Sequence, residues 1–303
     1  MFQKTIKKSF SLKGIGVHTN KETSLIFHPA DIDFGIQFIE DVGRKSCSVK
    51  ANINMLYHCK YQISLINKSF VVHTVEHLLS ALYGLGITNC LIQLEGNEIP
   101  IFDGSSKHYV DNFIKNGFII QNKSVDVKTI PSSVWIVKDN SYIYAIPNNK
   151  LEINAIIKYP HPLLEKESYQ FHFSKDSFIS NISDARTFGF LSDWESMKKN
   201  GYALGSNLNN TLVFNDSTII NPPLRYPNEC VRHKILDFIA TLSLLEHNIH
   251  ASFYLYSSGH AIDLEFVKML NLILNNEIIE NNINDFNKNK IISRVKQDFG
   301  SIF

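Results

Sequence analysis

The sequence has few cysteines, and no two of them are close enough to suggest a metal or redox motif. Its four cysteines, Cys47, Cys59, Cys90 and Cys230, are widely and irregularly spaced, with no C-x-x-C pattern. Structural zinc sites and thiol redox sites characteristically use such closely spaced pairs. We therefore expect buried thiols in a reducing cytosol rather than a disulfide framework.

Long apolar runs and an excess of one charge are missing as well. No stretch approaches the roughly 20 apolar residues of a membrane-spanning helix, and the lysines near the N-terminus precede no apolar run like that of a secretory signal. The formal net charge is +1, so no global field favours nucleic acid or an anionic membrane. We expect a cytoplasmic protein that binds no nucleic acid, does not insert stably into membranes and binds any phosphate locally.

The first part of the chain changes its hydrophobic period near residue 74. Before this point apolar and polar residues alternate in short bursts, which is the period of half-buried strands. From Thr74 the apolar residues fall on one helical stripe that ends near two glycines: Val75, Leu78, Leu79, Leu82 and Leu85. A strand at 90–95, a turn-rich loop and a second helix at 107–117 are predicted to follow.

The same order returns near the end, with a helix at 228–248, a strand at 251–256, a tight loop at 257–263 and a helix at 264–276. We therefore predict an α+β fold of two similar domains, each a small sheet packed with helices. The predicted boundaries are 1–122 and 128–303, with a polar linker at 121–129. An insertion at about 189–217 carries a short helix at 192–200, and the Asn-rich segment 275–290 is expected on the surface.

One short motif on the first predicted helix carries metal-binding chemistry. His73, Glu76 and His77 spell H-x-x-E-H, one of the spacings by which metallopeptidases hold zinc. On a helix the two histidines share a face. Three interpretations stay open at this point: both histidines bind zinc beside a Glu76 base, only His77 binds it with ligands from elsewhere, or all three are ordinary helix residues.

The second half supplies candidate partners. In "VRHKILD", His233 and Asp237 are four residues apart on a predicted helix, which lets an imidazole and a carboxylate reach one metal. Together with His77 they make three ligands and leave a fourth position for water, the requirement for a catalytic zinc. His260, in the tight loop "SSGHAID", is placed to face a cleft.

Five motifs in this order resemble a known family. They are "HTVEHLLSALYGLGITN", "EIPIFDGSS", "ARTFGF", "VRHKILD" and "SGHA", and the likeness runs from "GIGVHT" near the N-terminus to about Asn275. The sequence resembles the UDP-3-O-acyl-N-acetylglucosamine deacetylases, the zinc amidases of lipid A biosynthesis. The resemblance implies an active site at the domain interface and a Zn²⁺ cofactor.

The resemblance also implies roles for individual residues. It makes His77, His233 and Asp237 the zinc ligands, Glu76 the general base and His260 the general acid. It makes Thr187 a hydrogen-bond donor to the oxyanion. His73 lies where the family generally has a small hydroxyl residue, so we expect a partly buried, hydrogen-bonded histidine there and no ligand.

The implied substrate has a diphosphate, a uridine and a fatty acyl chain. Lys234 is placed to meet a phosphate, Tyr159 falls where the family carries an aromatic against the uracil, and Phe188 is expected in the sugar site. The insertion corresponds to the family's hydrophobic passage for the acyl chain. Its candidate lining residues include Leu191, Leu204, Leu208 and Val213.

Three positions depart from the family pattern. Thr241 stands where the family has an aspartate that supports the catalytic histidine, and loss of that carboxylate should destabilise the imidazolium form of His260. Asp263 is a hypothetical replacement for this countercharge. Lys158 replaces a usual acidic residue, which affects the expected nucleoside contacts.

We therefore predict a monomeric zinc-dependent amidohydrolase. It would remove acetate from UDP-3-O-acyl-N-acetylglucosamine and yield UDP-3-O-acyl-glucosamine, the committed step of lipid A biosynthesis. Two alternatives are an H-x-x-E-H metallopeptidase that uses His73, and a non-catalytic lipid-sugar-binding descendant.

Overall fold

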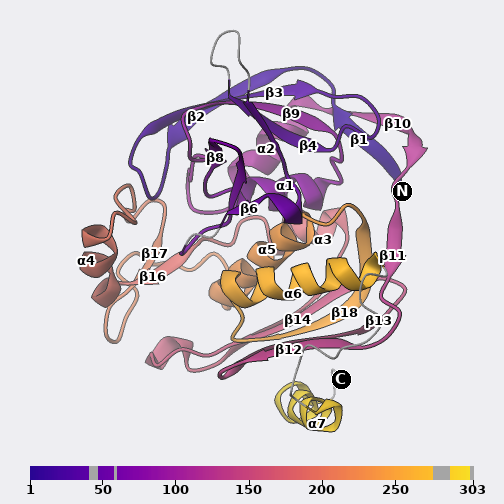
Figure 1. The fold of residues 1–303 in the computed structure, drawn as a ribbon. Coiled ribbons are helices and arrows are strands. Elements are labelled where there is room, and N and C mark those ends of the chain that lie inside the picture. The colour runs from indigo at the N-terminus through magenta and orange to yellow at the C-terminus, as the bar shows by residue number, and fades with distance from the viewer. Residues whose placement is uncertain (41–46, 58–59, 276–286, 301–303) are drawn as a thin grey trace.

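Two mixed sheets form opposite layers of the protein, with most of the helices between them (Figure 1). The computed structural model describes residues 1–40, 47–57, 60–275 and 287–300. In the first sheet the strand order is β2-β3-β9-β4-β5. These strands are β2 (Phe10–Ile15), β3 (Glu22–Pro29), β9 (Cys90–Glu95), β4 (Ile36–Glu40) and β5 (Cys47–Lys50).

The second sheet has the order β12-β13-β18-β14-β15, and β11 pairs with β18 in parallel. These strands are β11 (Val127–Thr129), β12 (Val134–Lys138), β13 (Ser141–Pro147), β14 (Leu151–Ile157), β15 (Glu167–His172) and β18 (Asn248–Tyr256). In each sheet the central strand pairs antiparallel with one neighbouring strand and parallel with the other. Strand β9 is antiparallel to β3 and parallel to β4, and β18 is antiparallel to β13 and parallel to β14. The matching topologies confirm the predicted α+β fold of two similar units, while the exact domain boundaries stay predictions.

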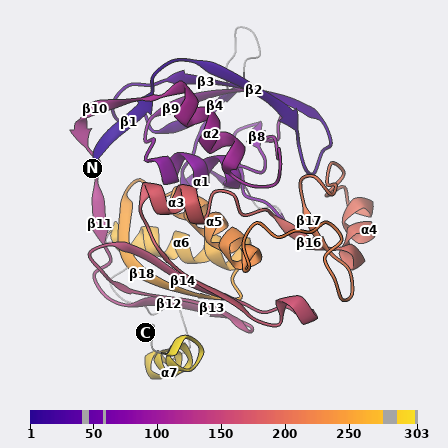
Figure 2. The ribbon, with the colours of Figure 1, turned by 180° about the vertical axis from the view of Figure 1, so that it is seen from behind.

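Each central strand lies between two helices in the chain, and these helices cover the inner face of its sheet. They are α1 (Glu76–Leu85) and α2 (Lys107–Asn116) in the first unit, and α5 (Glu229–Leu242) and α6 (His260–Leu274) in the second. Figure 2 shows from behind that α3 (Lys175–Asn181) lies in the same middle layer. Because α1 packs on α5, one hydrophobic core extends through both units.

Smaller elements complete the fold. The outer face of the second sheet is covered by α7 (Lys288–Phe299), which packs Ile291, Val295 and Phe299 against its aromatic side chains. The remaining elements are β1 (Phe2–Ile6), paired with β10 (Phe118–Ser124); β6 (Leu56–Tyr57), β7 (Ser64–Asn67) and β8 (Phe70–Val72); β16 (Phe188–Phe190), paired with β17 (Leu212–Phe214); α4 (Leu191–Lys199); and the 3₁₀ helices Ile53–Met55 and Pro162–Leu164.

The sequence of α1 explains where the helix lies and ends. All five residues of its predicted apolar stripe are buried. Gly86 adopts φ +69°, and its N–H bonds the carbonyls of Leu82 and Tyr83. This left-handed cap suits glycine and stops the helix after Leu85. The stripe therefore turns α1 toward α5 and the core.

Several predicted boundaries differ from the structure. The segment predicted as a linker at 121–129 forms the end of β10 and all of β11, because both strands find partners far away in the sequence. Helix α6 begins at His260, so this residue opens a helix and does not lie in a loop. Residues 276–286 of the predicted surface segment lie outside the described residues.

Two further expectations from the sequence concern the cysteines and membrane-spanning helices. Cys47, Cys90 and Cys230 are free thiols; the last two are buried and Cys47 is half-buried, while Cys59 lies outside the described residues. Among the helices in the described ranges, none combines the length and apolar character needed to cross a bilayer.

The contact between α1 and α3 predicts an unusual glycine requirement. A Cβ atom at Gly84 would lie 2.2 Å from Cδ1 of Phe178, whose ring is fully buried and cannot swing away. Gly84→Ala should lower the free energy of unfolding by about 1–3 kcal/mol, although alanine is the better helix former. Chemical denaturation measures this change.

Ser80→Ala in the same helix is the matched control. It removes a buried hydroxyl that has no hydrogen-bond partner and adds no atom, so stability should stay near that of the wild type. A Gly84→Ala protein as stable as the wild type would show that Phe178 does not limit the approach of the helices.

Candidate functional site

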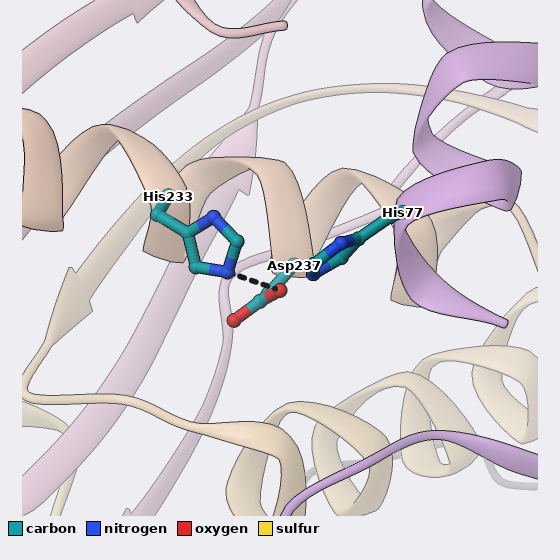
Figure 3. Close-up of side chains that lie close together, drawn as sticks. All are labelled: His77, His233 and Asp237. Carbon is teal, nitrogen blue, oxygen red and sulfur yellow. Dashed lines mark ion pairs between the residues drawn. The ribbon is translucent and has the colours of Figure 1, made fainter. Parts of the chain in front are cut away.

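The packing of α1 against α5 brings three potential metal ligands together. His77 comes from α1, and His233 and Asp237 come from successive turns of α5 (Figure 3). One ligand atom from each residue lies within 4.8 Å of the others, and all three residues are buried. The rings of His77 and His233 are 5.1 Å apart at 86°, and His233 Nε2 lies 3.5 Å from Asp237 Oδ1.

Hydrogen bonds hold these side chains and leave ligand atoms available. The Ala185 carbonyl accepts a bond of 3.0 Å from His233 Nδ1, which directs Nε2 toward Asp237. Ser106 donates to the backbone carbonyl of His77 at 2.7 Å. Asp237 Oδ1 and His77 Nδ1 are buried without a hydrogen-bond partner. Two imidazoles and a carboxylate with unpartnered atoms fit a divalent metal that keeps an open position.

The electrostatics favour the protonation states that a metal requires. Burial and the neighbouring His233 lower the pKa of His77 to about 3, and burial also lowers the pKa of His233. Although burial opposes it, the cluster of His233, Lys234 and His260 holds the pKa of Asp237 well below its usual range. At neutral pH the site therefore presents two neutral imidazoles and one carboxylate.

Glu76 is the first residue of α1 and lies beside the cluster. Its Oε2 accepts a hydrogen bond of 3.0 Å from the Ile63 backbone N–H. Burial, and secondarily the charge of Asp237, raises the pKa of Glu76 to about 8. A carboxylate whose pKa lies near neutrality is suited to accept a proton during a reaction.

His260 faces the cluster from α6. Its Nε2 lies 3.9 Å from Asp237 Oδ2, and burial lowers its pKa to about 4 while Asp237 opposes the shift. Side chains from α1, α5 and α6, which pack on two different sheets, thus meet around the Asp237 carboxylate.

One cavity of about 570 Å³ is lined by every site residue predicted from the sequence. These nine residues are Glu76, His77, Tyr159, Thr187, Phe188, His233, Lys234, Asp237 and His260. Their metal-ligand, catalytic and substrate-binding roles stay predictions, but their convergence on one cavity is a property of the fold.

The cavity has a cationic and aromatic wall next to the cluster. Lys234 Nζ lies 3.2 Å from Asp237 Oδ2 and 5.7 Å from the centre of the Phe188 ring. Tyr159 packs edge-on against Phe188 at 5.6 Å. Although burial opposes it, the Asp237 carboxylate raises the pKa of Lys234, so the ammonium stays charged. Thr187 is fixed by its N–H, which donates to Gly104 at 2.7 Å.

The insertion supplies an apolar wall. Leu191, Leu208 and Val213 line the cavity, as do Trp194 and Met197 on α4. Leu204, which the sequence also offered as a lining residue, does not belong to this wall and is 41% exposed.

His73 lies outside the cluster. It precedes α1, and its N–H bonds the Asn97 carbonyl while Ser64 Oγ lies 2.9 Å from its Nδ1. The next residue, Thr74, has φ +58°, so the chain is not helical between the two histidines. The expectation that His73 and His77 share a helical face was therefore wrong, and the expected hydrogen-bonded, partly buried His73 is confirmed.

Two residues near the cavity were missed by sequence reasoning. Glu98 is fully buried, and its carboxylate accepts hydrogen bonds from the His18 N–H at 2.8 Å and the Thr74 hydroxyl at 3.0 Å. This holds His18 on the cavity wall. The only signal in the sequence was an acidic residue between apolar neighbours in "NEIPIF".

The three departures have different environments. Thr241 donates its hydroxyl to the Asp237 carbonyl at 3.0 Å, within α5. Asp263 is fully buried, and among the described ion pairs His260 is joined to Asp237 and not to Asp263. Lys158 is exposed, with Nζ 5.8 Å from the centre of the Tyr256 ring.

Comparisons with known proteins agree with this geometry. Residues 3–271 match the family model of LpxC, UDP-3-O-acyl N-acetylglycosamine deacetylase. A protein of Thermodesulfovibrio yellowstonii with the name UDP-3-O-acyl-N-acetylglucosamine deacetylase is 37% identical over 269 residues, covering 89% of this chain and 91% of its own.

Two further relatives have the same name. That of Leptospira biflexa is 33% identical, covering 92% of this chain and 93% of its own, and that of Psychrobacter cryohalolentis is 36% identical, covering 97% and 89%. The family match extends over nearly the whole chain and includes every residue of the cavity described above. The chain therefore belongs to the UDP-3-O-acyl N-acetylglycosamine deacetylase family.

Proposed function

We propose that this protein hydrolyses the N-acetyl group of UDP-3-O-acyl-N-acetylglucosamine, a reaction of lipid A biosynthesis that yields acetate and UDP-3-O-acyl-glucosamine. One observation carries the proposal: His77, His233 and Asp237 meet in the cavity that Glu76 and His260 also line. The family membership and the names of the relatives support the substrate class.

The metal of this site is proposed to be Zn²⁺, held by His77, His233 and Asp237. Two nitrogen donors and one oxygen donor within 4.8 Å of one another suit its tetrahedral preference. When bound, Zn²⁺ supplies Lewis acidity, which lowers the pKa of water toward ~7 and polarises a carbonyl.

Glu76 and His260 are proposed to move the protons. Glu76 takes a proton from the attacking water, for which its raised pKa of about 8 suits it. An unprotonated sugar amine is a poor leaving group, so an acid is needed on its side. His260, which lines the same cavity and whose protonated form is favoured by the neighbouring Asp237 carboxylate, donates that proton, and the Thr187 hydroxyl donates a hydrogen bond to the oxyanion.

The rest of the cavity is proposed to bind the remainder of the substrate. The charged Lys234 meets a phosphate oxygen, Phe188 borders the sugar and Tyr159 packs against the uracil. The insertion at about 189–217 borders the acyl chain with Leu191, Leu208 and Val213. The side chains of this wall are apolar, which suits a fatty chain.

Three broader features belong to the same proposal. The domains are residues 1–122 and 128–303, each with one large sheet and the two helices that flank its central strand in the chain. The protein acts as a monomer, because residues of one chain line the whole candidate site. It acts in the cytoplasm, where its free thiols stay reduced.

The metal assignment predicts opposite results at two histidines. His233→Ala removes a proposed ligand and should abolish stoichiometric zinc binding, whereas His73→Ala should retain it, since His73 lies outside the cluster. Metal content of the purified variants, measured by inductively coupled plasma mass spectrometry, checks both. The reverse result would favour the H-x-x-E-H peptidase alternative.

The reaction predicts that acetate is released from the UDP-linked acylated sugar by the zinc-loaded protein. Glu76→Gln keeps the shape of the side chain but cannot accept the proton, so the rate should fall about 10²–10⁴-fold. The variant should retain its metal, because Glu76 is not a ligand. Substrate binding without acetate release in the wild type would instead identify a non-catalytic descendant.

A further inference from the structure

The turn between β2 and β3 of the first unit reaches the insertion of the second unit (Figure 1). The Gly205 N–H donates a hydrogen bond of 2.9 Å to the Val17 carbonyl. A Cβ atom at Gly205 would lie 2.4 Å from the carbonyl oxygen of Gly16, so the two backbones are in direct contact. Segments 16–18 and 203–205 thus join the two units, and we call them the turn–insertion contact.

The His18 ring adds a side-chain hydrogen bond to this contact. Its Nδ1 accepts from the Ala203 N–H at 3.1 Å, and the His18 carbonyl accepts from the Leu204 N–H at 3.3 Å. A backbone N–H can only donate, so Nδ1 carries no proton and a neutral ring holds its proton on Nε2. Burial lowers the pKa of His18, although the charge of Glu98 opposes the shift, so the ring is neutral at neutral pH.

A buried carboxylate fixes the turn that carries His18. Glu98 accepts hydrogen bonds from the backbone N–H groups of His18 and Thr19, each at 2.8 Å. A Cβ atom at Gly16 would lie 2.1 Å from Glu98 Oε2, so the turn closes tightly around the carboxylate. The acceptor atom of His18 is therefore held in one place on the first unit.

The insertion has less support of its own. None of the residues of α4 is buried, although Trp194 and Met197 of this helix line the cavity. After α4 the chain passes through Ala203 with φ +54°, a conformation that alanine rarely adopts. The Tyr202 ring packs edge-on against the His18 ring at 5.4 Å. The place of this apolar wall thus depends on the contacts that follow α4.

We propose that His18 is a positioning residue that fixes the apolar wall of the insertion to the first unit through its Nδ1 acceptor. The consequence for the substrate rests on the proposed function, in which this wall borders the acyl chain. His18 and Ala203 line the same cavity as Trp194 and Met197, so loss of the bond frees the wall beside the chain. His18 therefore acts on the binding of the acylated substrate and takes no part in proton transfer.

Two amide variants separate the two nitrogens of the His18 ring. The amide of His18→Asn ends near the position of Nδ1, so its oxygen can accept from the Ala203 N–H, whereas the amide of His18→Gln ends near the position of Nε2. In the zinc-loaded protein His18→Gln should raise KM for the UDP-linked acylated sugar about 10-fold with kcat unchanged. His18→Asn should restore the KM of the wild type.

Lys21→Ala is the matched control, because it removes an exposed side chain from the same turn and should leave KM unchanged. Equal KM values for folded His18→Gln and the wild type would overturn the proposal. A fall in kcat at unchanged KM would overturn it too, since that result would place His18 in the chemical step.

A second measurement needs neither turnover nor substrate. Hydrogen exchange followed by NMR reports the protection of the Ala203 amide, which should be strong in the wild type and in His18→Asn and at least about 10-fold weaker in His18→Gln. An unprotected Ala203 amide in the wild type would overturn the proposal, even if His18→Gln failed to fold. A protected amide in a wild type that released no acetate would support the contact and count against the proposed function alone.

Discussion

The contact between α1 and α5 is the constraint on which the site depends. Each helix belongs to a different sheet, and neither contributes a complete set of metal ligands. Only their packing sets the rings of His77 and His233 5.1 Å apart. On another side of α1, the absence of a side chain at Gly84 lets Phe178 of α3 pack closely against the helix. The apolar core that joins the two units therefore also determines the geometry of the site.

The two buried carboxyl groups of this site have pKa values shifted in opposite directions by their neighbours. Glu76 and Asp237 are both buried, but the cations and imidazoles around Asp237 stabilise its charge, whereas Glu76 receives a single backbone N–H beyond its own helix. Their pKa values are driven in opposite directions. One carboxyl is thus suited to stay ionised as a ligand and the other to exchange a proton, and such a separation is a common sign of acid–base function.

Much of this arrangement could be predicted from local patterns. The change of hydrophobic period at residue 74 located α1, and the repeated order of elements predicted two similar units, which the matching sheets confirm. Boundaries set by distant partners could not be predicted: β11 exists because it pairs with β18. The contacts of Glu98 with His18 and Thr74 likewise join segments that are remote in the sequence, and no periodicity encodes them.

His73 of the H-x-x-E-H motif does not share a helical face with His77, and the physical cause is the conformation of one residue. Thr74 adopts φ +58°, which costs a β-branched residue about 1–3 kcal/mol. Its hydroxyl offsets this cost through hydrogen bonds to Gln62 at 2.8 Å and to the buried Glu98 carboxylate at 3.0 Å. The turn delays the helix until Glu76, which sends His73 toward Ser64 and away from His77. The same turn sets Glu76 at the helix N-terminus, where its carboxylate accepts a hydrogen bond from the Ile63 N–H and borders the cavity. The conformation of Thr74 therefore both keeps His73 away from the proposed metal ligands and positions the proposed base.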